Sequence, residues 1–129
     1  MLKFIRNKGL DDVIKLKRNI PFQDIDKVYL NNDVFILTSK RELASVAVLE
    51  AMKYGLVCIS TNKNGTASYV DKKNGYIFKA EDEVSLCNIL LDLFYKKNQL
   101  PQMGIHTYQY AKDEFSPNSY FNKLLTMIK

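Results

Sequence analysis

The 129-residue chain is long enough to bury one hydrophobic core, and its 47% hydrophobic composition argues against both a disordered chain and a membrane-spanning bundle. Its formal net charge of +5 comes from lysines scattered along the sequence, so we expect no dedicated nucleic-acid surface and no nucleic-acid partner. A mildly basic surface favours anionic ligands and allows peripheral contact with an anionic membrane face.

The two cysteines and the single histidine form no catalytic or metal-binding pattern. Cys58 lies in an apolar run and Cys87 in a helical pattern, so we expect both thiols to be buried and reduced. His106 is expected to be a half-exposed helix residue, and no metal site is predicted. Residues 1–10 carry lysine and arginine among their apolar side chains, unlike a signal peptide, so the predicted location is cytoplasmic.

The first third of the sequence predicts a helix, a strand, a second helix and a second strand. Residues 1–8 read as a helix that stops at Gly9, and the alternating pattern of residues 13–17 predicts a short strand. After Pro21, a helical stripe predicts a helix over residues 22–30. The β-branched run of residues 34–38 predicts the next strand.

Residues 39–55 are predicted to hold the helix around which the chain is organised. Val46, Leu49 and Met52 recur at near-helical spacing, and Gly55 follows where a left-handed cap is expected. Because apolar strands flank this helix on both sides, the unit reads as one βαβ crossover. The helix N-terminus would then point to the carboxyl edge of the sheet, where an anionic group can bind.

Two carboxylates, Glu42 and Glu50, stand in this unit with seven residues between them. On one continuous helix they would lie roughly 12 Å apart, at about 1.5 Å per residue. Spacing alone also allows a structural interpretation, in which Ser39 and Glu42 form a capping box and Glu50 is a solvated helix carboxylate.

The second half of the sequence predicts a polar loop, a strand and a helical tail. Residues 60–65 form the loop, whose Asn64 and Gly65 allow positive φ, and residues 76–78 form the strand. An amphipathic helix is expected from Asp82, with acidic residues early and lysines late.

Breaks are expected in the helical tail. Pro101 and Gly104 should end the amphipathic helix, and a further helical segment should run over residues 106–129 with a pause at residues 116–117.

The run DVFILTSKRELASVAVLEAMKYGLVCISTNKNG resembles the donor-binding half of the retaining, GT-B-fold glycosyltransferases of group 1 (family 4). VDKKNGYIF and DEFSPNSYFNKLL are similar to the next strand and the closing helix of that family, so the resemblance runs from about Gly9 to the end. It implies an α/β fold with a Rossmann-like three-layer parallel sheet, and one partial nucleotide-sugar-binding domain over residues 1–129.

The resemblance also implies roles for individual residues. Glu42 would meet the transferred sugar as the catalytic residue, and Glu50 would accept hydrogen bonds from the ribose hydroxyls. The remaining donor-binding positions are the amides that would face the diphosphate and the glycine loop beside the donor: Leu43, Ala44, Ser45, Val46, Asn64 and Gly65. Where the family commonly has Gly, then an aromatic residue or Leu, then Gly, Pro or Ser, this chain carries Leu43, Ala44 and Ser45, so two side chains lie where glycine often allows close approach to the sugar.

The implied activity is retaining transfer of a hexose from a nucleotide sugar to a glycan or lipid-linked acceptor, in polysaccharide biosynthesis and without a bound metal or other cofactor. Such a reaction would take place in the cytoplasm or at the inner face of the membrane. A catalytically inactive interaction module that keeps the fold is an alternative, and a GT-B sugar-nucleotide epimerase is a third.

The chain matches only about the last two-thirds of the family's donor domain, without the strands that supply an arginine and a lysine to the diphosphate. We therefore expect the chain alone to be inactive and to need an acceptor-binding domain. The strand at residues 13–17 must pair anew or remain loose, and one face of the sheet should be left thinly covered, with the late helices from Asp82 and His106 shielding part of it. Docking to the missing domain or self-association as a homo-oligomer would cover the remainder.

Overall fold

The computed structural model describes residues 1–127, except for the side chains of residues 120, 123 and 124. Its centre is a three-stranded parallel sheet of β1 (Val34–Leu37), β2 (Val57–Thr61) and β3 (Gly75–Phe78), in the order β1-β2-β3. Val34 pairs with Val57 and Cys58 with Gly75, so the three strands end near one another at a common carboxyl edge. Every residue of β2 is buried. The predicted α/β fold with a parallel sheet is confirmed.

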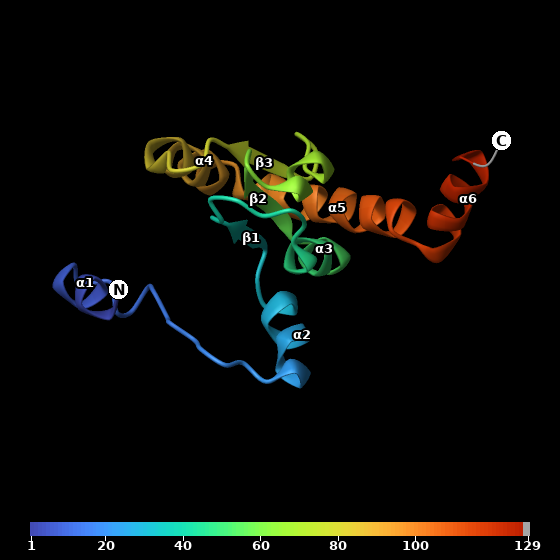
Figure 1. Ribbon diagram of the computed structural model, residues 1–129. Helices are drawn as coiled ribbons and strands as arrows, with labels where there is room; N and C mark the ends of the chain where they lie inside the picture. The colour runs from blue at the N-terminus through green and yellow to red at the C-terminus, as the bar shows by residue number, and fades with distance from the viewer. Residues whose placement is uncertain (128–129) are drawn as a thin grey trace.

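Helices surround this sheet, and their bounds are close to most of those expected. The α-helices are α1 (Leu2–Asn7), α2 (Phe22–Leu30), α3 (Val46–Lys53), α4 (Glu83–Tyr95), α5 (Leu100–Glu114) and α6 (Pro117–Met127), with 3-10 turns η1 (Gly65–Tyr69) and η2 (Lys97–Gln99). Figure 1 shows α1 lying away from the sheet and α6 at the opposite end of the molecule. Within residues 1–127, no helix is both long enough and apolar enough to cross a bilayer.

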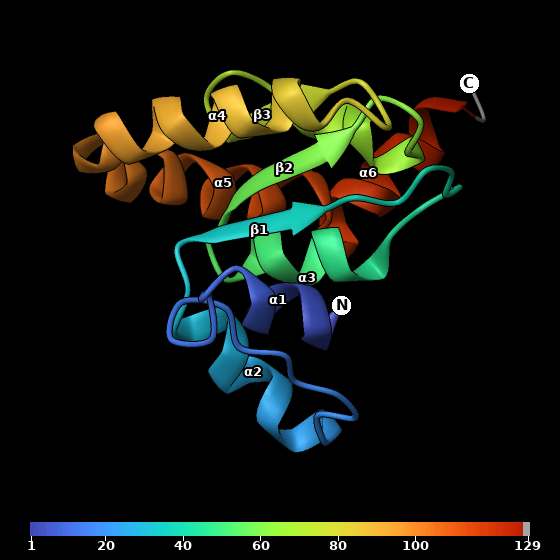
Figure 2. The ribbon, with the colours of Figure 1, turned by 90° about the vertical axis from the view of Figure 1, so that its left-hand side faces the viewer.

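The two faces of the sheet bury separate apolar clusters. On one face α2 and α3 pack over β1 and β2, with Tyr29, Val48 and Met52 among the buried side chains. On the other face α4 packs over β2 and β3, with Ile59 and Leu93 buried. Figure 2 shows α3 and α4 on opposite sides of the sheet. Of the late helices, α4 lies on the second face, whereas α5 contributes Met103 to the second cluster and Ala111 to the first.

The turn after α3 follows the expected geometry, but the start of α5 differs from prediction. Gly55 has a φ of +74°, which glycine adopts without strain, and the chain then enters β2. Pro101 and Gly104 do not separate two helices, because both lie inside α5. Pro101 occupies the first turn, where proline is tolerated, and Gly104 lies where α5 passes close to Gly55.

The predicted strand at residues 13–17 is wrong. The segment between α1 and α2 is exposed, and Val13 keeps 78% of its accessible surface. A strand requires a neighbour for its backbone N–H and C=O groups. Among residues 1–127 only β1, β2 and β3 form the sheet, so the segment has no such neighbour and remains irregular.

The two cysteines lie in different environments. Cys58 is fully buried in β2 as expected, and burial raises the pKa of its thiol to about 12. The prediction that Cys87 is buried is wrong, because its side chain is exposed on α4. The apolar stripe of α4 is wide, and sequence pattern alone did not show which of its flanks faces the sheet.

Candidate functional site

The loops at the carboxyl edge of the sheet are tied together by hydrogen bonds. The Thr61 hydroxyl donates to the Ser39 carbonyl over 2.7 Å, which joins the ends of β1 and β2. The Asn62 carboxamide oxygen accepts from the Ala80 amide over 3.1 Å, which joins the ends of β2 and β3. An exposed ion pair between Lys40 and Glu81 links the outer two loops. This edge is where open parallel sheets bind ligands.

Glu42 lies in the loop after β1 rather than on a helix, so the two glutamates do not share one continuous helix. The loop after β2 holds the Glu42 backbone through an isolated parallel bridge to Asn64. In this bridge the Gly65 amide donates to the Glu42 carbonyl over 3.0 Å, and the Glu42 amide to the Lys63 carbonyl over 3.4 Å.

Gly65 is required here by space. A Cβ atom at Gly65 would lie 1.7 Å from the carbonyl oxygen of Leu43, a distance that no side chain permits. Neither Asn64 nor Gly65 uses the positive φ that the sequence suggested. The predicted glycine loop is thus brought beside Glu42, but through close backbone approach rather than through a left-handed turn.

The Asn64 side chain points into the protein. It is 5% exposed, its carboxamide oxygen accepts from the Thr66 amide and hydroxyl, and its nitrogen donates to the Ser60 hydroxyl. Asn64 therefore shapes the loop from within and presents no free amide to the surface. Sequence reasoning missed Ser60 and Thr66, although an Asn-x-Thr pattern after a strand is a recognisable turn signal.

The segment between the glutamates leads into α3 with its backbone open. Leu43 is 95% exposed, Ala44 is exposed, and Ser45 is buried immediately before the helix. The Ser45 side chain makes no capping hydrogen bond, and the first amides of any α-helix have no partner within the helix. Because α3 starts at Val46, Ser39 and Glu42 do not form the capping box that spacing alone allowed.

Glu50 lies on the second turn of α3, where a residue of α2 binds it. The Tyr29 hydroxyl donates to Glu50 Oε2 over 3.0 Å. The Tyr29 ring is buried and stacks on Tyr54, with centroids 5.4 Å apart and planes inclined by 14°. Burial, followed by the hydrogen bond to Glu50, raises the pKa of Tyr29 to about 12, so this phenol remains a donor at neutral pH.

A hollow of about 470 Å³ lies between α3 and α5, and Glu50 forms part of its wall. Apart from the polar Ser116, the other residues around it are apolar, aromatic or basic: Leu49, Lys53, Tyr108, Ala111, Lys112 and Phe115. Glu42 does not line this hollow. The two glutamates are held by different segments, Glu42 by the loop that leads into η1 and Glu50 by α2 and α3.

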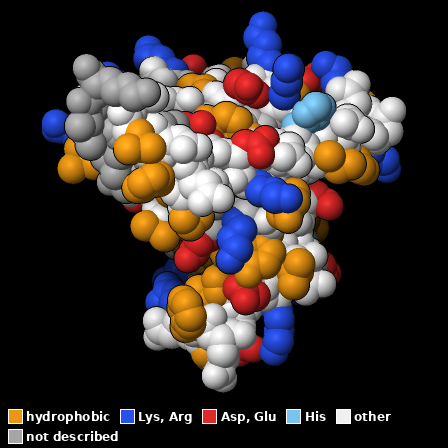
Figure 3. Space-filling view, turned by 90° about the vertical axis from the view of Figure 1, so that its right-hand side faces the viewer, with side chains coloured by type: hydrophobic (Ala, Val, Ile, Leu, Met, Phe, Trp, Pro, Cys, Tyr) orange, Lys and Arg blue, Asp and Glu red, His pale blue; other side chains and the backbone are white. Residues whose placement is uncertain are grey.

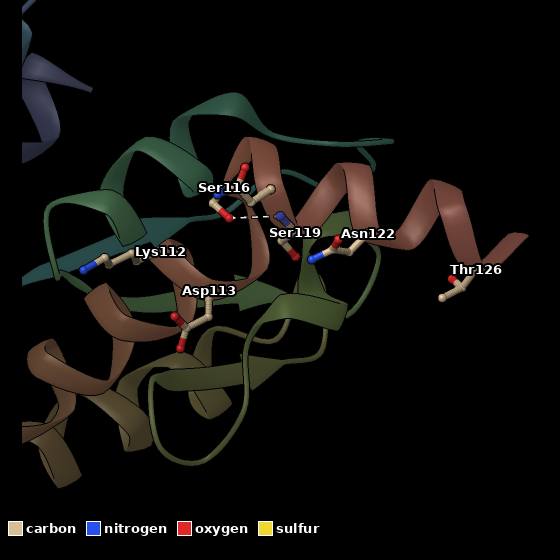
Figure 4. Close-up of a pocket in the computed structure, with 7 residues that line it drawn as sticks. Lys112, Asp113, Ser116, Ser119, Asn122 and Thr126 are labelled. Carbon is tan, nitrogen blue, oxygen red and sulfur yellow. Dashed lines mark hydrogen bonds between the residues drawn. The ribbon is translucent and has the colours of Figure 1, made fainter.

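A second hollow, of about 610 Å³, lies between α5 and α6 and contains none of the predicted site residues. In Figure 4 the side chains of Lys112 and Asp113 point in different directions, and Thr126 lies on a later turn of α6. The Ser116 hydroxyl is bonded to the Ser119 amide over 3.1 Å. These polar groups do not converge on one point, so this hollow is a weaker candidate site.

His106 is exposed on α5, as expected for a helix residue at the surface. On the face seen in Figure 3, the histidine lies at the surface and acidic and basic side chains are interspersed. Among residues 1–127, no three histidine, cysteine, aspartate or glutamate side chains are placed to share a metal ion.

Sequence reasoning also missed Tyr29 and Thr61 as supports of the site. Thr61 ends an apolar strand with a polar side chain at the carboxyl edge, which is a signal of a role in the loops there. Tyr29 gave no such signal, because an aromatic residue in a helical stripe is expected in the core. Only the packing of α2 against α3 reveals its contact with Glu50.

The chain is similar to known proteins that transfer or bind sugars. The family model described as "Glycosyl transferases group 1" matches residues 1–109. An Escherichia coli relative, UDP-Gal:alpha-D-GlcNAc-diphosphoundecaprenol alpha-1,3-galactosyltransferase, is 36% identical over 69 residues, which are 53% of this chain and 18% of that protein.

Two solved structures share the fold at low sequence identity. Sucrose-phosphate synthase from Thermosynechococcus elongatus aligns with a TM-score of 0.83 at 16% identity, over 98% of this chain and 33% of its own. Anabaena HepE in complex with UDP-glucose aligns with a TM-score of 0.80 at 17% identity, over 98% of this chain and 35% of its own. This chain thus spans about a third or less of the length of these proteins. Because the family model covers most of the sequence, the chain belongs to the group 1 glycosyl transferases.

Proposed function

We propose that this chain binds the nucleotide-sugar donor of a retaining glycosyltransferase, with a uridine diphosphate sugar as the ligand. The observation that carries the proposal is the open N-terminus of α3 at the carboxyl edge of the sheet, with Glu42 before it and Glu50 on its second turn. The E. coli relative is named for a UDP-sugar, and HepE was solved with UDP-glucose, which supports uridine as the base.

The diphosphate is proposed to lie against the amides of residues 43–46. Unpaired N–H groups and the positive end of the helix dipole favour an anion at this position. The exposed backbone around Leu43 and Ala44 leaves the approach open. No base-specific contact is needed for this part of the ligand, so it would be shared by any nucleoside diphosphate.

Glu50 is proposed to bind the ribose. An ionised carboxylate offers two oxygens, and a vicinal diol presents two hydroxyl donors at matching spacing. Glu50 Oε2 already accepts from Tyr29, which leaves Oε1 and the remaining lone pair of Oε2 for the diol.

Glu42 is proposed to be the catalytic residue that meets the transferred sugar. Its backbone is fixed by the Asn64 and Gly65 loop, which would place its carboxylate reproducibly near the donor. Leu43 puts an exposed side chain where a glycine would leave room, so the sugar is expected to contact it.

The full reaction is proposed to be transfer of a hexose, with retention, to a glycan or lipid-linked acceptor in polysaccharide biosynthesis, with no bound metal. The E. coli relative is named for a diphosphoundecaprenol acceptor, which supports a lipid-linked one and a site at the inner face of the membrane. Transfer needs both substrates held in line, so the acceptor site is expected to come from another domain. The free thiols of Cys58 and Cys87 are consistent with a cytoplasmic location.

Titration of UDP and UDP-galactose by ligand-observed NMR tests the proposal. Glu50→Gln should weaken binding of both ligands by about 1.5 to 3 kcal/mol, the range for hydrogen bonds to a charged group. Glu42→Gln should weaken UDP-galactose more than UDP, since only the former carries a sugar. Glu83→Gln, at an exposed position on α4, is the matched control and should change neither.

A wild-type chain that binds neither ligand would contradict the proposal. It would instead favour an interaction module that keeps this fold without donor binding. If Glu50→Gln bound both ligands as tightly as the wild-type chain does, donor binding would stand but the proposed contact between Glu50 and the ribose would be rejected.

A further inference from the structure

The contact between Tyr29 and Glu50 joins two helices that are otherwise distant in the sequence. Tyr29 is the eighth residue of α2 and Glu50 lies on α3, twenty-one positions later, with 3.0 Å between the hydroxyl and Oε2. The Tyr29 side chain is only 8% exposed, so the hydroxyl reaches Glu50 from the core. The carboxylate is thus approached from the buried side.

The Tyr29 ring is held on two sides. Tyr54 stacks on it at 5.4 Å, and Phe35 of β1 lies at 6.3 Å with planes inclined by 51°. A ring packed in this way has little freedom, so its hydroxyl occupies a fixed point. A glutamate side chain has several rotatable bonds and loses freedom when it binds a ligand. A fixed donor on one oxygen removes part of that freedom before the ligand arrives.

We propose that Tyr29 is a positioning residue that holds Glu50 by one oxygen and turns the other toward the ribose hydroxyls. This inference rests on the proposed donor site, and it adds a specific role for α2, which carries none of the residues assigned to the ligand. The phenol is neutral, so it orients the carboxylate without cancelling its charge. A lysine or arginine in its place would orient the carboxylate but would also offset its negative charge.

The test compares the affinity of the 129-residue chain for two nucleotides, UDP and 2′-deoxy-UDP. The second lacks one of the ribose hydroxyls that would donate a hydrogen bond to Glu50. Tyr29→Phe keeps the packed ring and removes only the hydroxyl. We expect the preference of the wild-type chain for UDP to fall roughly three- to tenfold in Tyr29→Phe, as for loss of one oriented hydrogen bond. Tyr54→Phe, which removes the hydroxyl of the stacked partner, is the matched control and should leave the preference unchanged.

A structural role would have a different signature. If Tyr29→Phe weakened both nucleotides by the same factor, the preference would be preserved and the inference overturned. If the preference depended on Glu50→Gln but not on Tyr29→Phe, the donor site would stand and only the role of Tyr29 would fall. A wild-type chain with no preference for UDP would reject the ribose contact and the role of Tyr29 together.

A second measurement needs no variant at Tyr29. The ¹³Cζ resonance of Tyr29 reports the hydrogen bonding of its hydroxyl, so addition of UDP to the wild-type chain should shift it. The same addition to Glu50→Gln should shift it less. A resonance that stays in place while UDP binds the wild-type chain would overturn the inference.

Discussion

Gly55 and Gly104 face each other across the contact between α3 and α5. A Cβ atom at Gly104 would lie 2.6 Å from the Gly55 carbonyl oxygen, and one at Gly55 would lie 3.0 Å from the Gly104 carbonyl oxygen. Both neighbours are backbone atoms, which cannot rotate away as a side chain can. The paired glycines therefore set how closely α5 approaches the end of α3.

Gly104→Ala should destabilise the fold despite the better helix propensity of alanine. Overpacking against backbone costs about 1 to 3 kcal/mol, whereas the gain in propensity is about 1 kcal/mol, so we expect a net loss in the free energy of unfolding. Urea denaturation followed by circular dichroism measures it. Gln102→Ala, exposed on the same helix, is the control, and a Gly104→Ala chain as stable as this control would show that α5 can shift without cost.

Gly65→Ala should displace the loop that carries Glu42. The added methyl group would overlap the Leu43 carbonyl, so the bridge between Glu42 and Asn64 has to open. We expect the chain to keep most of its helical signal but to lose the effect of Glu42 on UDP-galactose binding. Gly9→Ala, where an added Cβ atom meets nothing within 4 Å, is the control in the same titration. Full affinity for the sugar nucleotide in Gly65→Ala would mean that the bridge does not position Glu42.

The two thiols should differ strongly in reactivity. Cys87 is exposed on α4, whereas Cys58 is buried in β2 with a pKa raised to about 12 by burial. Under native conditions, iodoacetamide should modify Cys87 readily and Cys58 only after unfolding. Peptide mass spectrometry of a time course distinguishes the two sites. Equal labelling of both at early times would contradict the packing of β2.

Stability should fall at alkaline pH because of Cys58. Its pKa is about 12 in the folded chain and 9.0 for an ordinary thiol, so the folded state holds the proton more tightly. The contribution of the protonated Cys58 thiol to the free energy of unfolding is fully present below about pH 9. It is lost as the pH rises toward 12, at up to about 1.4 kcal/mol per pH unit. The stability of the wild-type chain relative to Cys58→Ala should therefore decrease across this window in denaturant titrations. A difference that is constant with pH would show that the thiol is not desolvated.

Local patterns were sufficient to predict the central βαβ unit. The apolar runs before and after α3, and Gly55 at its end, each specify one element without reference to distant residues. The same holds for α4, where Asp82 accepts from the Ser85 amide as an N-terminal cap. These elements agree with their sequence signals because no tertiary contact opposes them.

The failures share a dependence on neighbours that sequence does not show. Residues 13–17 have a strand pattern but no strand beside them, so the pattern had no effect. Gly104 was expected to break a helix, yet it serves the contact with Gly55. The family resemblance assigned Glu42 and the glycine loop to one site. The backbone bridge from Glu42 to Asn64 and the hydrogen bond from the Tyr29 hydroxyl to Glu50 could not be predicted, because both depend on packing between distant segments.

The loop that carries Glu42 is held mainly through its main-chain groups. Its path therefore depends little on which side chains it carries. The hydrogen bonds from the Gly65 amide to the Glu42 carbonyl and from the Glu42 amide to the Lys63 carbonyl use main-chain groups, and the Thr61 hydroxyl binds the carbonyl of Ser39 rather than its side chain. Leu43 is almost fully exposed and contributes no side chain to these bonds. For protein engineering, positions 43 and 44 can thus be varied as a small combinatorial library that leaves the course of the loop unchanged, and the library tests whether these side chains influence the proposed donor binding.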